Sequence, residues 1–241
     1  LDEANKKETV DVSYPKIVAH RGVSSVWPEN SLIAFEKAVE IRADGVECDL
    51  RRTADGRIVL MHDASIDRTT RGTGYVFALT FAEVRRHAIK DPRQPDRAYP
   101  DQRVPSLAEF LDLMGPSGLE LRIELKEVGF EEEVVQQIRE RGLADRTVLT
   151  SFLPAAIQTV KSCDRSIRTG LITSRFSQVR YEVIRPDIDA VDFGVAWEFS
   201  REMYQRAKSD GLTLDVWTID DPEQFRSIAE LAPDYVTTNF P

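Results

Sequence analysis

Short apolar runs rich in β-branched residues recur along the chain, and amphipathic stretches separate them. This alternation is typical of a parallel sheet whose strands are connected by helices. The apolar runs predict nine strands, over residues 17–20, 45–50, 57–62, 121–125, 147–152, 168–172, 190–195, 214–219 and 235–238. The amphipathic stretches predict helices over residues 31–41, 80–89, 106–114, 130–142, 154–163, 200–211 and 221–232.

The second and third apolar runs are too close together to be parallel. They are connected around residues 53–57, Thr-Ala-Asp-Gly-Arg, whereas a parallel crossover needs about a dozen residues. Asp55-Gly56 is a hairpin-turn signal, so we expect the third run to return antiparallel beside the second. If the turn centres on Asp55, residues whose numbers sum to 110 face each other, and His62 lies opposite Cys48. Eight strands remain for a (β/α)8 TIM barrel, with the hairpin at its C-terminal rim.

The domain organisation follows from length and polarity. The polar opening, residues 1–15, is expected to be a flexible N-terminal arm, and residues 16–241 are long enough for one large domain. The irregular stretch over about 63–105 is unusually long for a loop in a compact domain. We therefore expect it to form a short lid, or a small cap beside the site.

Composition excludes several classes of protein. A net charge of −9 and a pI of about 5.0 give no basic surface for nucleic acid or for an anionic membrane. No apolar run is long enough to span a bilayer. Two cysteines are too few for a disulfide framework and lack zinc-site spacing. We expect a cytoplasmic monomer or dimer, although an exported or periplasmic protein whose signal preceded Leu1 would have the same site.

Acidic side chains gather at the C-terminal ends of the predicted strands, where barrel enzymes place their chemistry. Glu47 and Asp49 are two residues apart on one strand and therefore share a face, and Glu124 and Lys126 do the same on another. Carboxylate ligands without a thiol suit Mg²⁺ or Ca²⁺ better than zinc. The alternative is that these residues form only salt bridges at the rim.

Cations and histidines lie at the same rim. Arg21 and Lys126 beside a metal would form a phosphate site, because a guanidinium binds phosphate oxygens bidentately and an ammonium adds a point charge. His20 and His62 can act as general acid and base near neutral pH. Together these groups predict cleavage of a phosphodiester.

The chain resembles the glycerophosphodiester phosphodiesterase family, a group of phospholipase C-like TIM barrels. The motifs that carry the resemblance run in order along residues 16–241: H-R-G at 20–22, P-E-N-S at 28–31, E-C-D at 47–49, T-A-D-G at 53–56, H-D at 62–63, R-T-T-R-G-T-G at 68–74, V-P-S-L-A-E at 104–109, E-L-K at 124–126 and V-W-T at 216–218. The resemblance implies His20 and His62 as the acid–base pair, Glu47, Asp49 and Glu124 as ligands of one divalent cation, and Arg21 and Lys126 as phosphate contacts.

The resemblance also assigns supporting residues. Trp217 would form a wall beside the glycerol or the leaving group, and Glu29 would orient a catalytic neighbour. Asn30 or Ser31 can cap the following helix. Phe152 is expected in the core and not at the substrate.

The expected reaction is metal-dependent hydrolysis of a glycerophosphodiester to sn-glycerol 3-phosphate and an alcohol such as choline or ethanolamine. One alternative is a lysophospholipase D-type reaction on lysolipids, and another is a catalytically silent barrel that binds phosphodiesters. The sequence does not decide which histidine is the base, nor whether water or a substrate hydroxyl attacks first.

Overall fold

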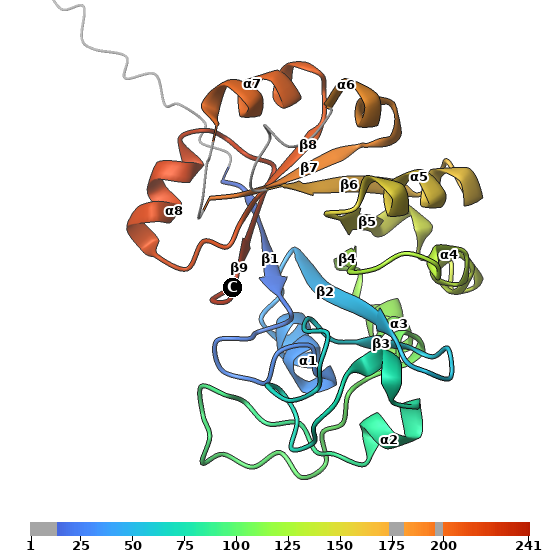
Figure 1. Ribbon diagram of the computed structural model, residues 1–241. Helices are drawn as coiled ribbons and strands as arrows, with labels where there is room; N and C mark the ends of the chain where they lie inside the picture. The colour runs from blue at the N-terminus through green and yellow to red at the C-terminus, as the bar shows by residue number, and fades with distance from the viewer. Residues whose placement is uncertain (1–13, 174–180, 196–199) are drawn as a thin grey trace, which may run out of the picture.

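The computed structural model describes residues 14–173, 181–195 and 200–241, so most of the expected N-terminal arm lies outside the described residues. Within them, eight parallel strands form a closed ring in the order β1-β9-β8-β7-β6-β5-β4-β2, and β2 pairs with β1 to close it. The strands are β1 Lys16–His20, β2 Gly45–Arg52, β4 Glu120–Leu125, β5 Thr147–Ser151, β6 Arg168–Thr173, β7 Ala190–Gly194, β8 Thr213–Trp217 and β9 Tyr235–Thr238. Helices lie outside this ring (Figure 1), so the predicted TIM barrel is confirmed.

The predicted hairpin is also confirmed. Strand β3, Ile58–Leu60, runs antiparallel to β2 and lies outside the ring. Its register pairs Leu50 with Leu60 and Arg52 with Ile58, which gives the expected sum of 110. The strand is shorter than the predicted run over 57–62, but the amide of Met61 still donates to the carbonyl of Asp49 at 2.9 Å. The hairpin therefore carries His62 to the rim beside β2.

All seven predicted helices are present in the described part of the chain. They are α1 Leu32–Glu40, α2 Phe81–Arg85, α3 Leu107–Met114, α4 Glu131–Glu140, α5 Pro154–Cys163, α7 Arg201–Ser209 and α8 Pro222–Ala229. Helices α2 and α3 each begin with a capping box, in which the cap hydroxyl and a glutamate three residues later satisfy each other's backbone amides. The helix α6, Tyr181–Ile184, was not predicted, because four residues are too few to show an apolar period.

The segment over 63–105 packs beside the barrel next to α1 and β3 (Figure 1). It contains α2 and the short 3-10 turn Val76–Ala78. Its residues Ile66, Val76, Val84, Ile89 and Val104 form a small apolar cluster with Val59 of β3 and the adjacent Met61. Of the two forms expected, a short lid or a small cap, the segment has the form of a small cap.

In the described residues, no helix has the length and apolarity to cross a bilayer.

The chain turns sharply where β1 ends, and Gly22 makes this turn possible. Gly22 has φ of +81°, a region that side chains disfavour. A Cβ atom on Gly22 would lie 2.6 Å from the carbonyl carbon of Ala34 in α1. The loop that follows β1 can therefore lie close against α1 only with glycine at this position.

We expect Gly22→Ala to lower the free energy of unfolding by more than Gly56→Ala, as measured by urea denaturation. Gly56 is a matched control, because its φ of +82° is nearly the same but a Cβ there would have no atom within 4 Å. The conformational cost alone is about 1–2 kcal/mol, and the clash at Gly22 adds about 1–3 kcal/mol. Equal losses of the free energy of unfolding in the two variants would show that the close contact with Ala34 does not restrict the residue at position 22.

Candidate active site

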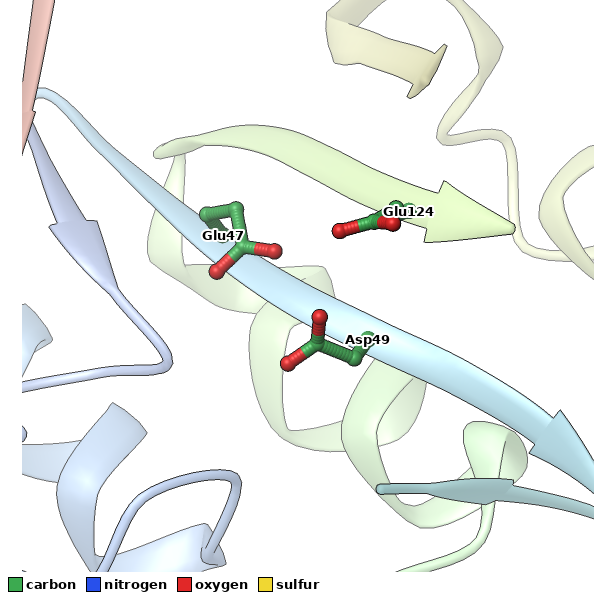
Figure 2. A group of neighbouring side chains, drawn as sticks. All are labelled: Glu47, Asp49 and Glu124. Atoms are coloured by element: carbon green, nitrogen blue, oxygen red, sulfur yellow. The ribbon is translucent and has the colours of Figure 1, made fainter. Parts of the chain in front are cut away.

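Three carboxylates converge at the C-terminal mouth of the barrel. Glu47 and Asp49 lie on β2, and Glu124 lies on the neighbouring strand β4, where it is paired in register with Asp49. One oxygen from each side chain lies within 4.8 Å of the others. Figure 2 shows the three carboxylates pointing toward one another from the two strands.

Two cations and one amide hold the most buried of these carboxylates. Asp49 lies 3.1 Å from Nε of Arg21 and 3.2 Å from Nζ of Lys126. Nδ2 of Asn30 donates to Asp49 at 2.7 Å, while Lys126 also donates to Glu124 at 2.9 Å. Arg21 and Asn30 reach these positions with φ of 57° and 52°, a backbone conformation that residues with a side chain seldom adopt outside sites that require it.

Burial and the neighbouring charges raise the pKa of two of the carboxylates and lower the pKa of the third. Burial and the charge of Asp49 raise the pKa of Glu124 to about 7, and the same causes raise the pKa of Glu47 well above its usual value. Although burial opposes ionisation of Asp49, Arg21 and Lys126 outweigh it and lower the pKa of this residue. One carboxylate is therefore kept ionised, and the other two are poised to take up a proton or a cation.

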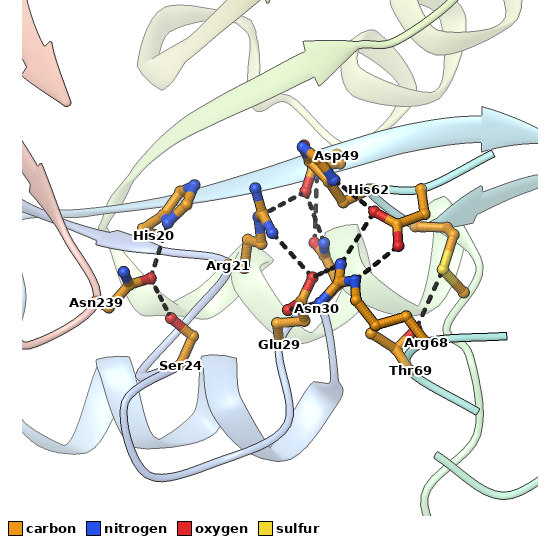
Figure 3. A network of polar contacts seen from close by, with 12 residues as sticks. His20, Arg21, Ser24, Glu29, Asn30, Asp49, His62, Arg68, Thr69 and Asn239 are labelled. Carbon is orange, nitrogen blue, oxygen red and sulfur yellow. Dashed lines mark hydrogen bonds and ion pairs between the residues drawn. The ribbon is translucent and has the colours of Figure 1, made fainter. Parts of the chain in front are cut away.

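His20 is held from its Nδ1 side. Nδ1 lies 2.8 Å from Oδ1 of Asn239, the residue that follows β9 (Figure 3). The orientation of the Asn239 amide is fixed because Nδ2 donates to Asp220 at 2.6 Å and Oδ1 accepts from Ser24 at 2.7 Å. Nδ1 of His20 must therefore carry the proton, which leaves Nε2 for chemistry. Burial, with Arg21 nearby, lowers the pKa of His20 to about 4.

His62 is held in the same way by a carboxylate. Its Nδ1 lies 2.8 Å from Oδ1 of Asp63, so Nε2 is again left for chemistry. Nε and NH2 of Arg51 donate to the carbonyl of His62 at 3.0 and 2.8 Å and fix its backbone. Burial lowers the pKa of His62. Both histidines therefore present the same ring nitrogen at one site.

One pocket lies at this mouth of the barrel. His20, Arg21, Glu47, His62, Glu124 and Lys126 face it, and Trp217 and Phe152 form an aromatic wall with ring centroids 5.8 Å apart. Nε1 of Trp217 donates to the carbonyl of Asp192 at 3.1 Å, which fixes the indole. The expectation that Phe152 belongs to the core is wrong: β5 ends at Ser151, and Phe152 is 43% exposed at the pocket.

The floor of the pocket is charged. Arg122 on β4 is buried, lies 3.0 Å from Asp215 and donates to Asp192 at 2.5 Å. Thr237 also donates to Asp215, at 2.7 Å. Burial and the neighbouring Asp215 raise the pKa of Asp192 to about 7, although Arg122 opposes this shift. The barrel is therefore closed beneath the site by an ion network instead of by aliphatic side chains.

The model of the glycerophosphoryl diester phosphodiesterase family matches residues 20–241. The chain belongs to this family. A glycerophosphodiester phosphodiesterase from Caldanaerobacter subterraneus subsp. tengcongensis is 28% identical over 231 residues, which cover 93% of this chain and 94% of that protein. The resemblance and the enzyme class expected from the sequence are confirmed, so this family member has glycerophosphodiester phosphodiesterase activity.

Solved structures support the same assignment. A glycerophosphodiester phosphodiesterase from Agrobacterium tumefaciens has a TM-score of 0.79 and 25% identity, with 93% of this chain and 96% of that chain covered. A phosphodiesterase from Oleispira antarctica, solved in complex with the product sn-glycerol-3-phosphate, has a TM-score of 0.81 and 25% identity. The match covers 95% of this chain and 94% of that chain.

The structure brings every predicted site residue of the phosphodiesterase to one rim, while their catalytic roles stay predictions. Ser31, one of the two predicted caps, does cap α1 by accepting from the amide of Ala34 at 3.3 Å. Asn30 binds Asp49 instead. The sequence reasoning missed Asp63 and Asn239, each of which holds a histidine through a side-chain hydrogen bond. For Asn239 a signal existed, because the residues that follow two paired strands lie side by side.

We expect Arg122→Met to destabilise the phosphodiesterase by about 3–5 kcal/mol at pH 8, because it leaves Asp192 and Asp215 buried without their cation. The loss should be smaller at pH 5. A buried carboxyl with a raised pKa destabilises the folded state as the pH rises above about 3.9, the pKa of aspartate in the unfolded chain. Removing the guanidinium raises the pKa in the folded state further, so the additional loss of stability appears at the higher pH.

Urea denaturation at both pH values measures this effect. Arg146→Met is the control, because the guanidinium of Arg146 donates to backbone carbonyls, including those of Met114 and Gly115. The free energy of unfolding that Arg146→Met loses should therefore be the same at pH 5 and pH 8. A loss in Arg122→Met that is the same at both pH values would contradict the charged-floor interpretation.

Proposed function

We propose that this phosphodiesterase hydrolyses glycerophosphodiesters to sn-glycerol 3-phosphate and an alcohol, with one divalent cation and with His20 and His62 as the acid–base pair. The observation that carries the proposal is one pocket lined by both histidines, whose Nδ1 atoms are bound by the protein, and by Glu47 and Glu124. Asp49 completes the carboxylate cluster. The sn-glycerol-3-phosphate bound to the Oleispira antarctica enzyme supports the identity of the product.

The carboxylate cluster fits a hard divalent cation. Glu47, Asp49 and Glu124 supply oxygen atoms and no thiol, which suits Mg²⁺ or Ca²⁺. In the described part of the chain, Oδ1 of Asp49 is buried and accepts no hydrogen bond, although Lys126 lies 3.2 Å away. Burial and the charge of Asp49 raise the pKa values of Glu47 and Glu124, and a cation bound among the carboxylates would favour their ionised forms. When bound, the cation would polarise the phosphoryl oxygens and neutralise developing charge.

Charge balance favours a phosphodiester as the ligand. When ionised, the three carboxylates outnumber the two cations that contact them, Arg21 and Lys126, by one charge. A divalent cation reverses this imbalance and leaves one positive charge. A phosphodiester monoanion then neutralises the site. Until the phosphodiester binds, the ion pairs of Arg21 and Lys126 with the carboxylates keep these side chains in place.

The histidines and cations of the chain have separate tasks. Nε2 of one histidine accepts a proton from the attacking group, which is water or a substrate hydroxyl, and Nε2 of the other donates a proton to the leaving alkoxide. Asn239 and Asp63 keep the rings oriented by holding their Nδ1 atoms. Arg21 and Lys126 place positive charge where the phosphoryl oxygens become more negative.

We expect His20→Ala and His62→Ala each to lower kcat for glycerophosphocholine by about 10²–10⁴-fold, the usual contribution of general acid–base catalysis. Release of glycerol 3-phosphate, coupled to glycerol-3-phosphate dehydrogenase, measures the rate. Chelation with EDTA should abolish turnover of the wild-type chain, and added Ca²⁺ or Mg²⁺ should restore it. Both variants should still bind the cation in calorimetry, because neither residue is a proposed ligand.

His87→Ala is the matched control. His87 is the third histidine of the chain, lies in the cap segment and does not line the pocket. It should retain full activity. Full activity in either of the other two variants would exclude acid–base catalysis by that residue. If the wild-type chain releases no glycerol 3-phosphate from any glycerophosphodiester with metal present, the proposed reaction is refuted.

One observation favours a second candidate, a lysophospholipase D-type reaction. Exposed apolar side chains occur in the loops that follow β1, β4, β5 and β9 at the C-terminal rim of the barrel; they are Val26, Val128, Phe152, Leu153 and Phe240. Of these five, Phe152 lines the pocket. Such a rim would suit the acyl chain of a lysolipid. If lysolipids are the substrates, turnover of lysophosphatidylcholine should rise at its critical micelle concentration and exceed that of glycerophosphocholine. A rate that stays lower across this concentration would exclude the second candidate.

A further inference from the structure

Arg68 connects two carboxylates that come from different parts of the chain. It lies in the cap segment, and its guanidinium donates to both oxygens of Glu29, at 2.6 and 2.8 Å. On its other side it donates to both oxygens of Asp63, at 2.6 and 3.1 Å. Figure 3 shows the Arg68 guanidinium close to Glu29 and Asn30 in the loop that follows β1.

Each of these carboxylates holds a proposed catalytic group. Asp63 lies 2.8 Å from Nδ1 of His62, and Glu29 accepts from NH1 of Arg21 at 2.9 Å. We propose that Arg68 is a positioning residue, which sets His62 and Arg21 relative to each other by clamping Asp63 and Glu29 together. This inference rests on the proposed roles of His62 and Arg21. Arg68 itself does not line the pocket, so it acts through its two partners.

The geometry requires an arginine. A guanidinium has a planar fork of donors that can serve two carboxylates at once, whereas an ammonium is a compact point charge. Arg68 uses Nε and NH2 for Asp63, and NH1 and NH2 for Glu29. The hydrogen bonds from Arg68 are the main reason that the pKa of Asp63 is depressed, so Asp63 faces His62 as a carboxylate.

The cap segment keeps Arg68 at this place. The flanking residues Ile66, Thr69 and Thr70 are buried, and the amide of Lys90 donates to the carbonyl of Thr69 at 2.9 Å. The far end of the segment binds the same loop after β1. NH2 of Arg93 donates to the carbonyl of Trp27 at 3.1 Å, and the guanidinium of Arg97 lies 4.5 Å from the centre of the Trp27 ring. The cap therefore contacts this loop on two sides.

The simpler interpretation is a surface ion pair of little consequence, since exposed pairs contribute about 0–1 kcal/mol. The Arg68 side chain is 38% exposed, so its burial does not exclude that interpretation. The same segment offers a matched pair for comparison. Arg85 is 35% exposed and donates to both oxygens of Glu109, at 2.6 and 2.8 Å, away from the pocket. The two arginines differ in whether their partners contact a catalytic group.

The experiment measures steady-state kinetics on glycerophosphocholine, with metal present, for Arg68→Lys, Arg68→Ala and the control Arg85→Lys. We expect Arg68→Lys to lower kcat about 10- to 100-fold, the usual effect of removing a residue that orients a catalytic group, with KM changed less than kcat. Arg85→Lys should match the wild type. Added guanidinium should restore part of the kcat of Arg68→Ala, while tetramethylammonium at equal ionic strength should not.

Two further variants keep the inference testable if Arg68→Ala folds poorly. They are Asp63→Asn and the double variant that combines it with Arg68→Lys. Both substitutions interrupt the same connection, so the loss in kcat of the double variant should be smaller than the product of the separate losses. Thermal unfolding of each variant separates a folding defect from a kinetic one.

Each outcome bears on one hypothesis. If the wild-type chain is active and Arg68→Lys has the same kcat, the positioning role is rejected and the proposed function stays intact. A raised KM at constant kcat would also reject it, because Arg68 would then contribute to binding. An equal loss in Arg68→Lys and Arg85→Lys would indicate a stability effect and likewise reject it. Absence of turnover in the wild-type chain would instead refute the proposed function.

Discussion

The repulsion among Glu47, Asp49 and Glu124 is the interaction on which the arrangement of the site depends. The two-residue period of β2 places Glu47 and Asp49 on one face, and the parallel register with β4 brings Glu124 beside Asp49. Like charges at this separation need a proton or a cation between them. The backbone ladder between β2 and β4 fixes the positions of the strands, so the acids cannot move far apart. Positive charge must therefore come to them.

The chain brings part of that charge at a conformational cost. Arg21 reaches Asp49 from a turn in which Arg21, Gly22 and Asn30 all have positive φ. Such a turn persists only where the surrounding contacts determine it. Here the contacts are numerous: Asn30 binds Asp49, Gly22 packs against Ala34, and the cap segment holds the loop through Trp27. The segment over 63–105 therefore supports the loop that follows β1.

Sequence periodicity predicts the parts of the fold that are set by strand geometry. The closed ring of strands, the antiparallel hairpin and its register, and the shared face of the acids all follow from alternation, spacing and one Asp-Gly turn. The parts fixed by side-chain hydrogen bonds between distant loops were not predicted. His20 and Asn239 are 219 positions apart, and only the pairing of β1 with β9 brings them together. Arg68 lies in a segment without periodicity, so its partners could not be deduced.

This difference has a physical origin that also bears on how the site works. A backbone register positions a carboxylate because the hydrogen-bonded ladder leaves its Cβ little freedom. A histidine at a strand end or beyond it has free side-chain torsions, and its ring orientation must be set by a partner at Nδ1. Asn239 and Asp63 are those partners, and each is itself held by a further residue, Asp220 and Arg68. The positions of the three carboxylates therefore depend on the barrel, whereas the orientations of the two histidines depend on chains of side-chain hydrogen bonds. Substitutions outside the pocket can consequently disturb the histidine rings while leaving the carboxylate cluster intact.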